Sequence, residues 1–353
     1  MILPLPRLQP GWLISETNDP EDASFDAFVA RLSNNRWNVL RLPGTSRDLA
    51  DAGDLLFVDL TTEKIPAALD ETIGNALKQS VPILFHGPAE LITKMSKQLF
   101  LRPMLLTPGD LPHWWGPERM DEELIRTTPP LPITSVTLGR NWAIVETSES
   151  IGLAAMTHPM GPPADQAESV DPMSMIGMPL NKAAAGLREL VGMRRTIACA
   201  AVNAAIPPSP DAVPGDGLLS DEADPDRTTV IVGRFPALQT KRPDAIVLEM
   251  SPGPEDMPAG AAPHVLPGAG ELLITASAWC NGTLPGLLRL AREVPVTLVG
   301  PGTPLTPTLH AYGIKKLAGF RIIDRDAVRS AIASGGGVKA FKEFGEQIVL
   351  SAD

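Results

Sequence analysis

The sequence predicts an α/β protein whose C-terminal part contains a doubly wound parallel sheet. Four short segments carry this prediction, because each begins as an apolar run and ends in Gly, Pro, Asn, Thr or Glu. A continuous apolar run bounded by turn residues is typical of a strand buried on both faces of a parallel sheet. Alternation of such strands with helical stretches favours the doubly wound arrangement. The four segments are residues 230–236, 245–252, 272–283 and 296–304.

Residues 1–125 are predicted to form a small α/β domain of their own. Between residues 25 and 101, helical and strand patterns alternate in the manner of such a domain. The stretch 111–132 is rich in Pro, Trp and charge, and we expect it to be a linker. Helices are expected at 25–32, 65–78 and 89–101, and strands at 37–42, 54–60 and 81–85.

Residues 131–206 are predicted to form a second, α+β domain. Three strand-like pieces joined by polar turns, at 135–138, 142–146 and 151–156, indicate an antiparallel meander. Two helical segments, 179–191 and 196–205, are expected to pack on that sheet. Pro-rich and acidic stretches then interrupt all regular patterning between residues 207 and 226. The last domain is therefore assigned to residues 207–353.

In the last domain the predicted strands end near Gly233, Glu249, Thr275 and Gly300. Helices are expected at 283–293 and 326–334, and a short strand at 320–323 is expected to close the sheet. The carboxyl ends of parallel strands form the crevice in which open α/β sheets bind ligands. Four polar strand ends at one edge therefore predict a binding site there, without identifying its ligand.

Composition narrows the class of partner. With 353 residues and 44% hydrophobic residues, the chain is long and apolar enough to bury a core. Its formal net charge of −11 argues against a nucleic-acid backbone or an anionic membrane as the main partner. No secretion signal and no apolar run of about 18–20 residues is found. The two cysteines lack the spacing of a secreted scaffold, so we expect a reducing cytoplasm.

The first strand end carries Gly233, Arg234, Phe235 and Pro236. Gly-Arg-Phe-Pro is not the glycine fingerprint of a dinucleotide site, so a standard NAD site is not expected. The glycine would let the backbone approach a ligand, with Arg234 meeting an anion and Phe235 stacking on it. The alternative is an ordinary strand-to-helix turn with a surface arginine.

Glu249 ends the second strand, where nucleotide-binding α/β domains place the carboxylate that accepts hydrogen bonds from ribose. This position favours a nucleoside-like ligand. Two alternatives stay open, namely that the carboxylate binds a metal or that it satisfies backbone N–H groups of the loop at 251–258.

Two further loops follow predicted strands. Asn281, Gly282 and Thr283 are expected to start a helix that Thr283 caps, and exposed amides there would attract phosphate or carboxylate. The loop that begins Gly300-Pro301 and continues through Thr303 and Pro304 repeats this pattern, but it lacks the Gly-Lys-Ser/Thr of a P-loop. ATP hydrolysis is therefore not supported, and capping alone would explain both loops.

Few residues suit a metal site. The five histidines never fall at two-ligand helical spacing, and the cysteines are far apart in sequence. Cys280 at the predicted ligand edge could be a soft ligand or a nucleophile, whereas Cys199 among alanines is expected in the core. Cys280 and Glu249 are thus the metal candidates, and no Ser/His/Asp or Cys/His set can be assembled from sequence order.

In combination, several ordered motifs resemble the putative heavy-metal chelation family. The resemblance covers about residues 131–353 and implies a Rossmann-like C-terminal domain after a domain of enolase-N-terminal type. The chain departs from the family at 275–280, where Thr-Ala-Ser-Ala-Trp-Cys replaces a Thr-Gly-Thr/Ser-Thr pattern. The motifs lie at 139–143, 152–156, 186–190, 201–205, 232–236, 248–258, 280–284, 300–307 and 312–319. The family positions carried over are Gly233, Phe235, Pro236, Glu249, Pro252, Asp256, Asn281, Gly282, Thr283, Gly300, Pro301, Thr303 and Pro304.

The leading hypothesis is a cytoplasmic protein that binds a small anionic molecule, or a transition-metal complex of one, between the middle and C-terminal domains. The rival hypothesis is an enzyme of cofactor or metallophore biosynthesis that uses a nucleoside-containing cosubstrate. A third reading assigns the N-terminal domain to a protein partner or a homo-oligomer. Neither nucleic acid nor membrane is an expected partner.

Overall fold

The computed structural model describes residues 12–14, 23–42, 53–61, 69–79, 81–98, 103–105, 110–157, 170–218, 228–235 and 241–352. Contacts between Cα atoms divide the chain into two compact units, Met1–Trp115 and Gly116–Asp353. Each unit is described below by itself. The predicted domain boundaries at residues 125, 131 and 207 stay predictions.

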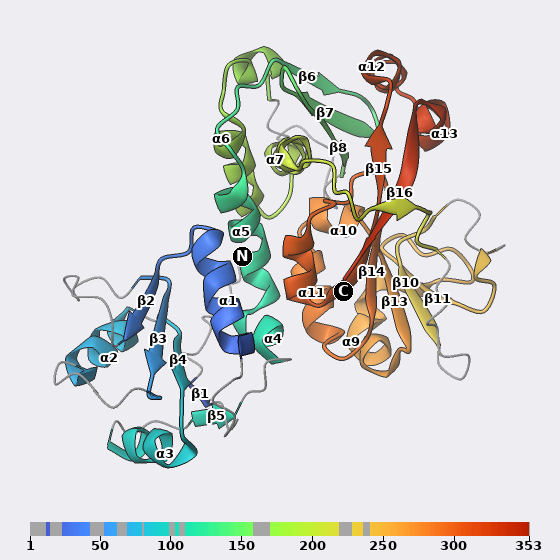
Figure 1. The fold of residues 1–353 in the computed structure, drawn as a ribbon. Helices are drawn as coiled ribbons and strands as arrows, with labels where there is room; N and C mark the ends of the chain where they lie inside the picture. The colour runs from blue at the N-terminus through green and yellow to red at the C-terminus, as the bar shows by residue number, and fades with distance from the viewer. Residues whose placement is uncertain are drawn as a thin grey trace. The chain divides into compact units, whose positions relative to one another are not determined.

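The first unit is built on a five-stranded sheet in which every pairing is parallel. The strand order is β2-β3-β4-β1-β5 (Figure 1). Leu56 of β3 and Ile83 of β4 form a core with Ile73 of α2 and Ile92 of α3. This burial on both faces explains why β3 and β4 are almost wholly apolar. The elements are β1 Trp12–Ile14, α1 Ala23–Asn34, β2 Val39–Leu42, β3 Leu55–Asp59, α2 Leu69–Lys78, β4 Ile83–His86, α3 Ala89–Gln98, β5 Pro103–Leu105 and α4 Leu111–Trp115.

The segment expected to be a linker, residues 111–132, contains the boundary between the two compact units and is largely helical. Helix α4 ends in Trp115, which is buried within the first unit and packs edge-on against Trp37. In the second unit, Pro117 starts the 3-10 turn η2, and α5 follows with Met120 and Leu124 buried on one face. Proline and charge interrupted the apolar pattern, but both residue types suit the first turn of a helix.

The second unit contains the expected antiparallel meander of three strands, β6 (Ser135–Leu138), β7 (Trp142–Glu146) and β8 (Ile151–Ala155). Helix α7 lies across it and is built mostly from small residues (Figure 1). A Cβ on Gly152 of β8 would collide with the Ala200 carbonyl oxygen, so strand and helix approach to backbone contact. This close approach is why both elements use Gly and Ala. The expected helix at 179–191 is a short helix, α6, followed by the 3-10 turn η4.

The larger sheet of the second unit has the order β12-β11-β10-β13-β14-β15-β16-β9. In chain order its strands are β9 Val213–Pro214, β10 Thr229–Val232, β11 Ile246–Glu249, β12 Met257–Pro258, β13 Glu271–Thr275, β14 Val296–Val299, β15 Ile314–Ile322 and β16 Gly345–Ser351. Strands β12 to β15 are parallel, which fits the predicted α/β class, whereas β16 and β9 are antiparallel. The short closing strand expected at 320–323 is instead the end of the nine-residue β15, and it pairs with β16, which the sequence pattern did not reveal. Exposed Lys315 and half-buried Glu346 interrupt the apolar pattern of this pair, because it lies toward the edge of the sheet.

The meander and the large sheet share one hydrophobic cluster. Trp142 and Leu153 of the meander pack with Ile332 and Phe341, which follow β15. A salt bridge between Arg329 and the buried Glu146 joins the same two parts, with two N···O distances of 2.7 Å. A cavity between these two parts is therefore a feature of one compact unit.

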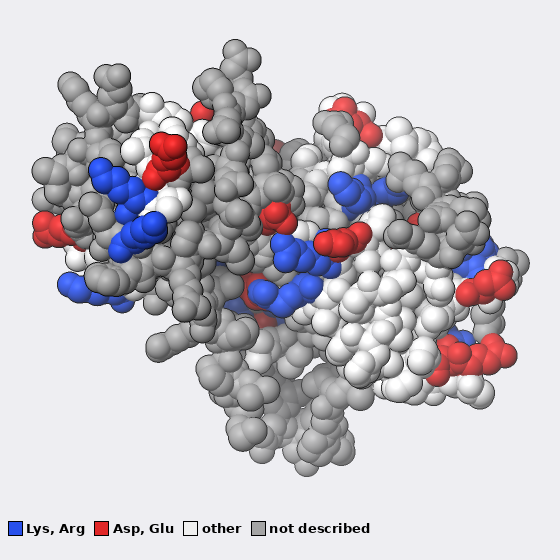
Figure 2. Space-filling model, turned by 90° about the horizontal axis from the view of Figure 1, so that it is seen from below, with Lys and Arg blue, Asp and Glu red and all other residues white. Residues whose placement is uncertain are grey.

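Two surface properties follow from the described residues. None of their helices has the length and apolar character required to cross a membrane. On the face drawn in Figure 2, the coloured acidic and basic side chains are intermixed rather than gathered by sign.

The elements of the second unit, in chain order, are η2 Pro117–Arg119, α5 Met120–Thr127, β6 Ser135–Leu138, β7 Trp142–Glu146, β8 Ile151–Ala155, η3 Pro172–Met175, α6 Leu180–Ala184, η4 Ala185–Arg188, α7 Met193–Ala205, β9 Val213–Pro214, β10 Thr229–Val232, β11 Ile246–Glu249, β12 Met257–Pro258, η5 Ala259–Ala261, α9 Ala262–Val265, η6 Leu266–Gly268, β13 Glu271–Thr275, α10 Ser277–Cys280, α11 Leu284–Leu290, β14 Val296–Val299, η7 Pro307–Tyr312, β15 Ile314–Ile322, α12 Arg325–Ala333, α13 Val338–Phe341, η8 Lys342–Phe344 and β16 Gly345–Ser351.

Candidate functional site

The strand order of the large sheet reverses at β10. Strand β10 pairs with β11 on one side and with β13 on the other, so the chain leaves it in opposite directions. Open α/β sheets bind ligands outside the carboxyl ends of the strands at such a switch point. Backbone bonds from Gly233 N to Leu248 O (2.9 Å) and from Gly300 N to Ala318 O (2.9 Å) continue the pairing to this edge. The strand ends that the sequence singled out thus lie along one edge.

Two cavities flank the switch point. The first, here called the β11-side cavity, has a volume of about 380 Å³ and is lined by Gly233, Glu249 and the 281–283 turn. The second, the β14-side cavity, measures about 290 Å³ and is lined by Phe235, Gly300 and Pro301. Three residues, Arg234, Thr275 and Ser277, line both cavities.

Arg234 is the cation placed at this switch point. Its side chain is about half exposed and donates a hydrogen bond to Asp256, which also accepts one from Gly253 N at 2.8 Å. The hydrogen bond from Arg234 lowers the pKa of the Asp256 carboxyl, so this carboxylate holds the guanidinium at the cavity wall. Phe235 lines the β14-side cavity and also packs against an apolar cluster formed mainly by side chains of β10, β13, β14 and β15. Pro236 lies outside the described residues.

Gly233 is required by packing inside the protein. Its φ is +92°, and a Cβ at this position would collide with the Thr275 side chain. The glycine therefore allows β10 and β13 to end side by side, which is the geometry that opens the switch point.

Glu249 lines the β11-side cavity, but its own loop occupies part of its carboxylate. Oε1 accepts a hydrogen bond from Met250 N at 2.8 Å and a longer one from Ser251 N at 3.5 Å. Among the described residues no hydrogen bond reaches Oε2. One carboxylate oxygen thus serves the loop, as one of the alternatives anticipated, and the other stays available to a ligand.

The 281–283 turn differs from its expected form. Helix α11 follows Thr283, yet the Thr283 side chain does not cap it and instead donates to Asn281 Oδ1 at 2.7 Å. Thr283 N also donates to Asn281 Oδ1, at 3.1 Å. Gly282 has φ +75°, and a Cβ there would collide with the Leu190 carbonyl oxygen. The glycine therefore fits the turn against Leu190, and a side chain at this position would strain the backbone.

A buried arginine that the sequence analysis missed anchors this turn. Arg195 is 3% exposed and donates to Trp279 O at 2.9 and 3.1 Å, to Glu189 O at 3.0 Å and to Leu187 O. It also pairs with Asp121 at 2.8 Å, which in turn accepts a hydrogen bond from Trp279 Nε1 at 2.9 Å. Arg195 sits in an alanine-rich helix with no distinguishing motif, so only the tertiary fold shows its role.

Cys280 does not face the cleft, which corrects the sequence expectation. Helix α10 turns its side chain inward, where it is fully buried and hydrogen-bonded to the Cys199 thiol of α7. Burial raises the pKa of the Cys199 thiol well above its usual value. In the described part of the chain, no three His, Cys, Asp or Glu side chains come together as a metal-binding group. The assignment of Cys280 and Glu249 as metal ligands stays a prediction.

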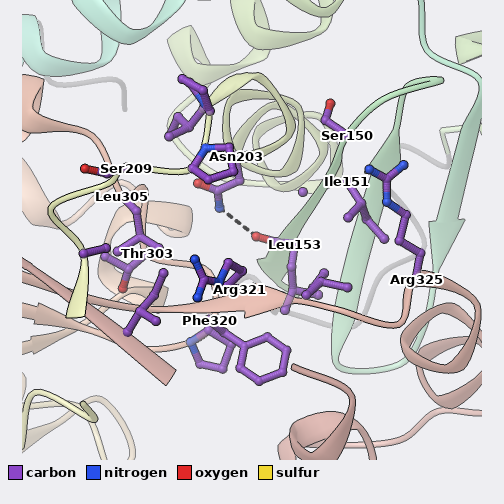
Figure 3. Close-up of a pocket in the computed structure, with 18 of the residues that line it drawn as sticks. Ser150, Ile151, Leu153, Asn203, Ser209, Thr303, Leu305, Phe320, Arg321 and Arg325 are labelled. Atoms are coloured by element: carbon purple, nitrogen blue, oxygen red, sulfur yellow. Dashed lines mark hydrogen bonds between the residues drawn. The ribbon is translucent and has the colours of Figure 1, made fainter. Parts of the chain in front are cut away.

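A third cavity lies between β8 and β15 and is here called the β8-side cavity (Figure 3). It measures about 190 Å³, and Thr303 lines it. Asn203, at the end of α7, donates from Nδ2 to Leu153 O at 2.7 Å and to Gly302 O at 2.9 Å. This amide joins the middle sheet to the loop after β14. Pro304 is buried beside Thr303 and lines none of the three cavities.

Two known solved structures share this fold. A protein of unknown function from Desulfitobacterium hafniense DCB-2 has a TM-score of 0.55 and 25% sequence identity, covering 66% of this chain and 98% of its own. A protein of unknown function from Pyrococcus horikoshii has a TM-score of 0.56 and 19% identity, covering 67% and 99% of the respective chains. At that lower identity the second likeness shows the fold alone. No curated protein matches the chain.

Family comparison agrees with the motifs. Residues 121–206 and residues 218–351 each match a family described as "Putative heavy-metal chelation". Both solved structures belong to the family matched by residues 218–351. The two matches together span more than half of the chain and confirm the resemblance identified from its sequence. The chain therefore belongs, over residues 121–206 and 218–351, to the family described as "Putative heavy-metal chelation".

Proposed function

We propose that the protein binds a small anionic organic molecule, alone or as a metal complex, at the switch point of its large sheet. The observation that carries this proposal is the pair of cavities that share Arg234. Their volumes of about 380 and 290 Å³ are at or near the range of small-molecule pockets, about 300–1,000 Å³. The site receives its ligand in the cytoplasm.

The charges around the β14-side cavity favour an anion. Arg234 lines both cavities, and Lys342 lines the β14-side cavity without an ion-pair partner among the described residues. The acidic Asp216 of the same cavity is already paired with Lys241. Because no three-ligand metal group is present in the described residues, a metal would enter as a complex in which the organic ligand supplies most of the donor atoms.

The test begins with what the purified protein retains. Native mass spectrometry with elemental analysis should detect an organic ligand, with metal only in stoichiometry to it. Metal retained in the absence of any organic ligand would contradict delivery as a complex.

Substitution of Arg234 then tests the site itself. Arg234→Gln should weaken binding of the retained ligand by roughly one to two decades, because a charge-assisted hydrogen bond contributes about 1.5–3 kcal/mol. Lys315→Gln is the matched control, since it removes a positive charge from an exposed position that lines neither cavity. Equal affinity of the two variants would reject the assignment.

Glu249 favours the second candidate function, an enzyme of cofactor or metallophore biosynthesis with a nucleoside cosubstrate. Its carboxylate ends β11 and faces the larger cavity, the position in which α/β domains bind ribose. Calorimetric titration with S-adenosylmethionine and adenosine tests this candidate. Binding that Glu249→Gln weakens would favour it, and no binding of either nucleoside by the unaltered protein would remove it.

A further inference from the structure

We propose that Cys199 and Cys280 are a redox-active pair, which a small peroxide converts into a disulfide bond between α7 and α10. This modification goes beyond the binding function proposed above, because it requires no ligand at the switch point. The chain has two cysteines, and both belong to the compact unit Gly116–Asp353. The fold brings them together although they are far apart in sequence.

The two thiols are already in contact. Cys199 lies on α7 and Cys280 ends α10, and both side chains are fully buried. Helix α10 packs against both α7 and β8. The Cys199 thiol donates a hydrogen bond to the Cys280 sulfur, so the two side chains point toward each other. Cysteines in this orientation can be bridged without unfolding either helix.

The surroundings of the two sulfur atoms differ, and the difference gives each a role. The hydrogen bond from Cys199 lowers the pKa of the Cys280 thiol. The Ala155 backbone N–H and the charge of Arg195 lower the same pKa further, against a weaker opposing effect of Asp121. Burial raises the pKa of the Cys199 thiol well above its usual value. Because the thiolate is the nucleophile, Cys280 attacks the oxidant first and Cys199 attacks second.

The oxidation is balanced by one molecule of hydrogen peroxide. The Cys280 thiolate attacks a peroxide oxygen, an S–O bond forms, and the O–O bond breaks. The hydroxide that leaves takes up the proton of the Cys280 thiol and becomes water. Cys199 then attacks the sulfur of this sulfenic acid, and the S–S bond forms as a second hydroxide leaves with the Cys199 proton. Each sulfur gives up one electron, and the peroxide accepts both.

The position of Cys280 favours a small oxidant. Ala155, whose N–H group donates to the Cys280 sulfur, also lines the β14-side cavity. Ala276 lines the same cavity, and its carbonyl oxygen accepts a hydrogen bond from Cys280 N at 3.3 Å. One residue therefore separates the Cys280 sulfur from the cavity. A local opening of this wall admits a peroxide, which is little larger than water, more readily than a bulky disulfide.

The test treats the reduced full-length protein with hydrogen peroxide under native conditions and then alkylates the remaining thiols in denaturant. The number of alkylated thiols should fall from two to none, and dithiothreitol should restore both. Digestion of the oxidised protein should yield one pair of linked peptides, containing Cys199 and Cys280. Two alkylated thiols after the treatment, or a bond between two chains on a non-reducing denaturing gel, would overturn the proposal.

Two variants test the roles of the sulfurs. Cys199→Ser keeps a hydroxyl group that can donate to Cys280, and the sulfenic acid formed there has no second thiol to attack it. Dimedone, which traps sulfenic acids, should label peroxide-treated Cys199→Ser at least tenfold more than Cys280→Ser when it is added with denaturant. Equal labelling would overturn the assignment of Cys280 as the attacking thiol.

The first measurement uses the unaltered protein, so it does not depend on the folding of a variant. Neither measurement uses a ligand. Failure of the redox pair would therefore leave the switch-point site untouched, and failure of Arg234→Gln to weaken ligand binding would leave the redox pair untouched.

Discussion

The 281–283 turn and the 300–304 loop look alike in sequence and differ in structure. The loop follows β14 directly, whereas the turn follows β13 after the short helix α10. Both combine glycine with threonine. In the turn, Thr283 and Asn281 bond each other and Gly282 fits against Leu190. In the loop, the Thr303 hydroxyl is buried without a partner beside a cavity. Similar strand-end sequences thus place their hydroxyl groups in different hydrogen-bonding environments.

The largest expected effect comes from removing the anchor of the turn. Arg195→Met should lower the free energy of unfolding by about 3–5 kcal/mol, because it leaves Asp121 and three carbonyl oxygens without their buried cation. Chemical denaturation measures this change. The neighbouring Arg194→Met is the control, since Arg194 is about half exposed and should change stability by less than about 1 kcal/mol. Equal effects in the two variants would mean that Arg195 does not anchor the turn.

The next effect separates a packed glycine from a ligand-facing one. Gly282→Ala should lower stability by about 1–3 kcal/mol, since its φ of +75° and the Leu190 carbonyl both oppose a side chain. Gly286→Ala inside α11 is the control, because no atom lies near a Cβ there. It should leave stability unchanged or raise it by up to about 1 kcal/mol. Thermal unfolding of both variants without ligand tests this prediction. If Gly282→Ala were as stable as the unaltered protein, packing would not require the glycine, and the turn would again be a candidate for binding a ligand.

One substitution made in both regions tests the comparison directly. Thr283→Val removes a satisfied hydroxyl and should cost about 0.5–1.5 kcal/mol. Thr303→Val removes an unsatisfied one and should leave the stability of the ligand-free protein unchanged or raise it by up to about 1 kcal/mol. Denaturation of both variants under one condition compares them. Similar losses at the two positions would show that Thr303 is satisfied in solution.

The smallest expected effect is a pH dependence of the stability that the Arg188–Glu122 ion pair contributes near Leu190. Arg188, two residues before Leu190 in the chain, donates two hydrogen bonds to Glu122, and these lower the pKa of the Glu122 carboxyl. A carboxyl whose pKa is lowered by folding adds stability above its unfolded value of 4.5 and loses it as the pH falls through the folded value. The pair is partly exposed, so the effect should be small.

The measurement compares Glu122→Gln with the unaltered protein. The difference in their free energies of unfolding should be largest above pH 4.5 and should decrease as the pH falls below that value. Glu293→Gln, at an exposed position, is the control and should change stability little over the same range. A difference that does not depend on pH would mean that the carboxyl charge of Glu122 does not stabilise the folded chain.

Several parts of the fold could be predicted because local pattern carries them. Buried parallel strands such as β13 and β14 are apolar throughout, and the meander shows its alternating pieces and polar turns. The edge strands β16 and β9 were not predicted, since exposure on one side removes the continuous apolar signal. The 111–132 helices were missed because proline and charge resemble a linker as well as a helix start.

The sequence by itself determined the α/β class, the family, and the alignment of Gly233, Glu249, Thr275 and Gly300 at one edge of a sheet. These follow from residues close together in the chain. Only the tertiary structure decided which strand-end groups are satisfied. It turned Cys280 toward Cys199, placed Arg195 under the 281–283 turn, and brought Asn203 to Thr303 across a cavity. Hydrogen-bond satisfaction depends on partners distant in sequence, and local spacing cannot report it.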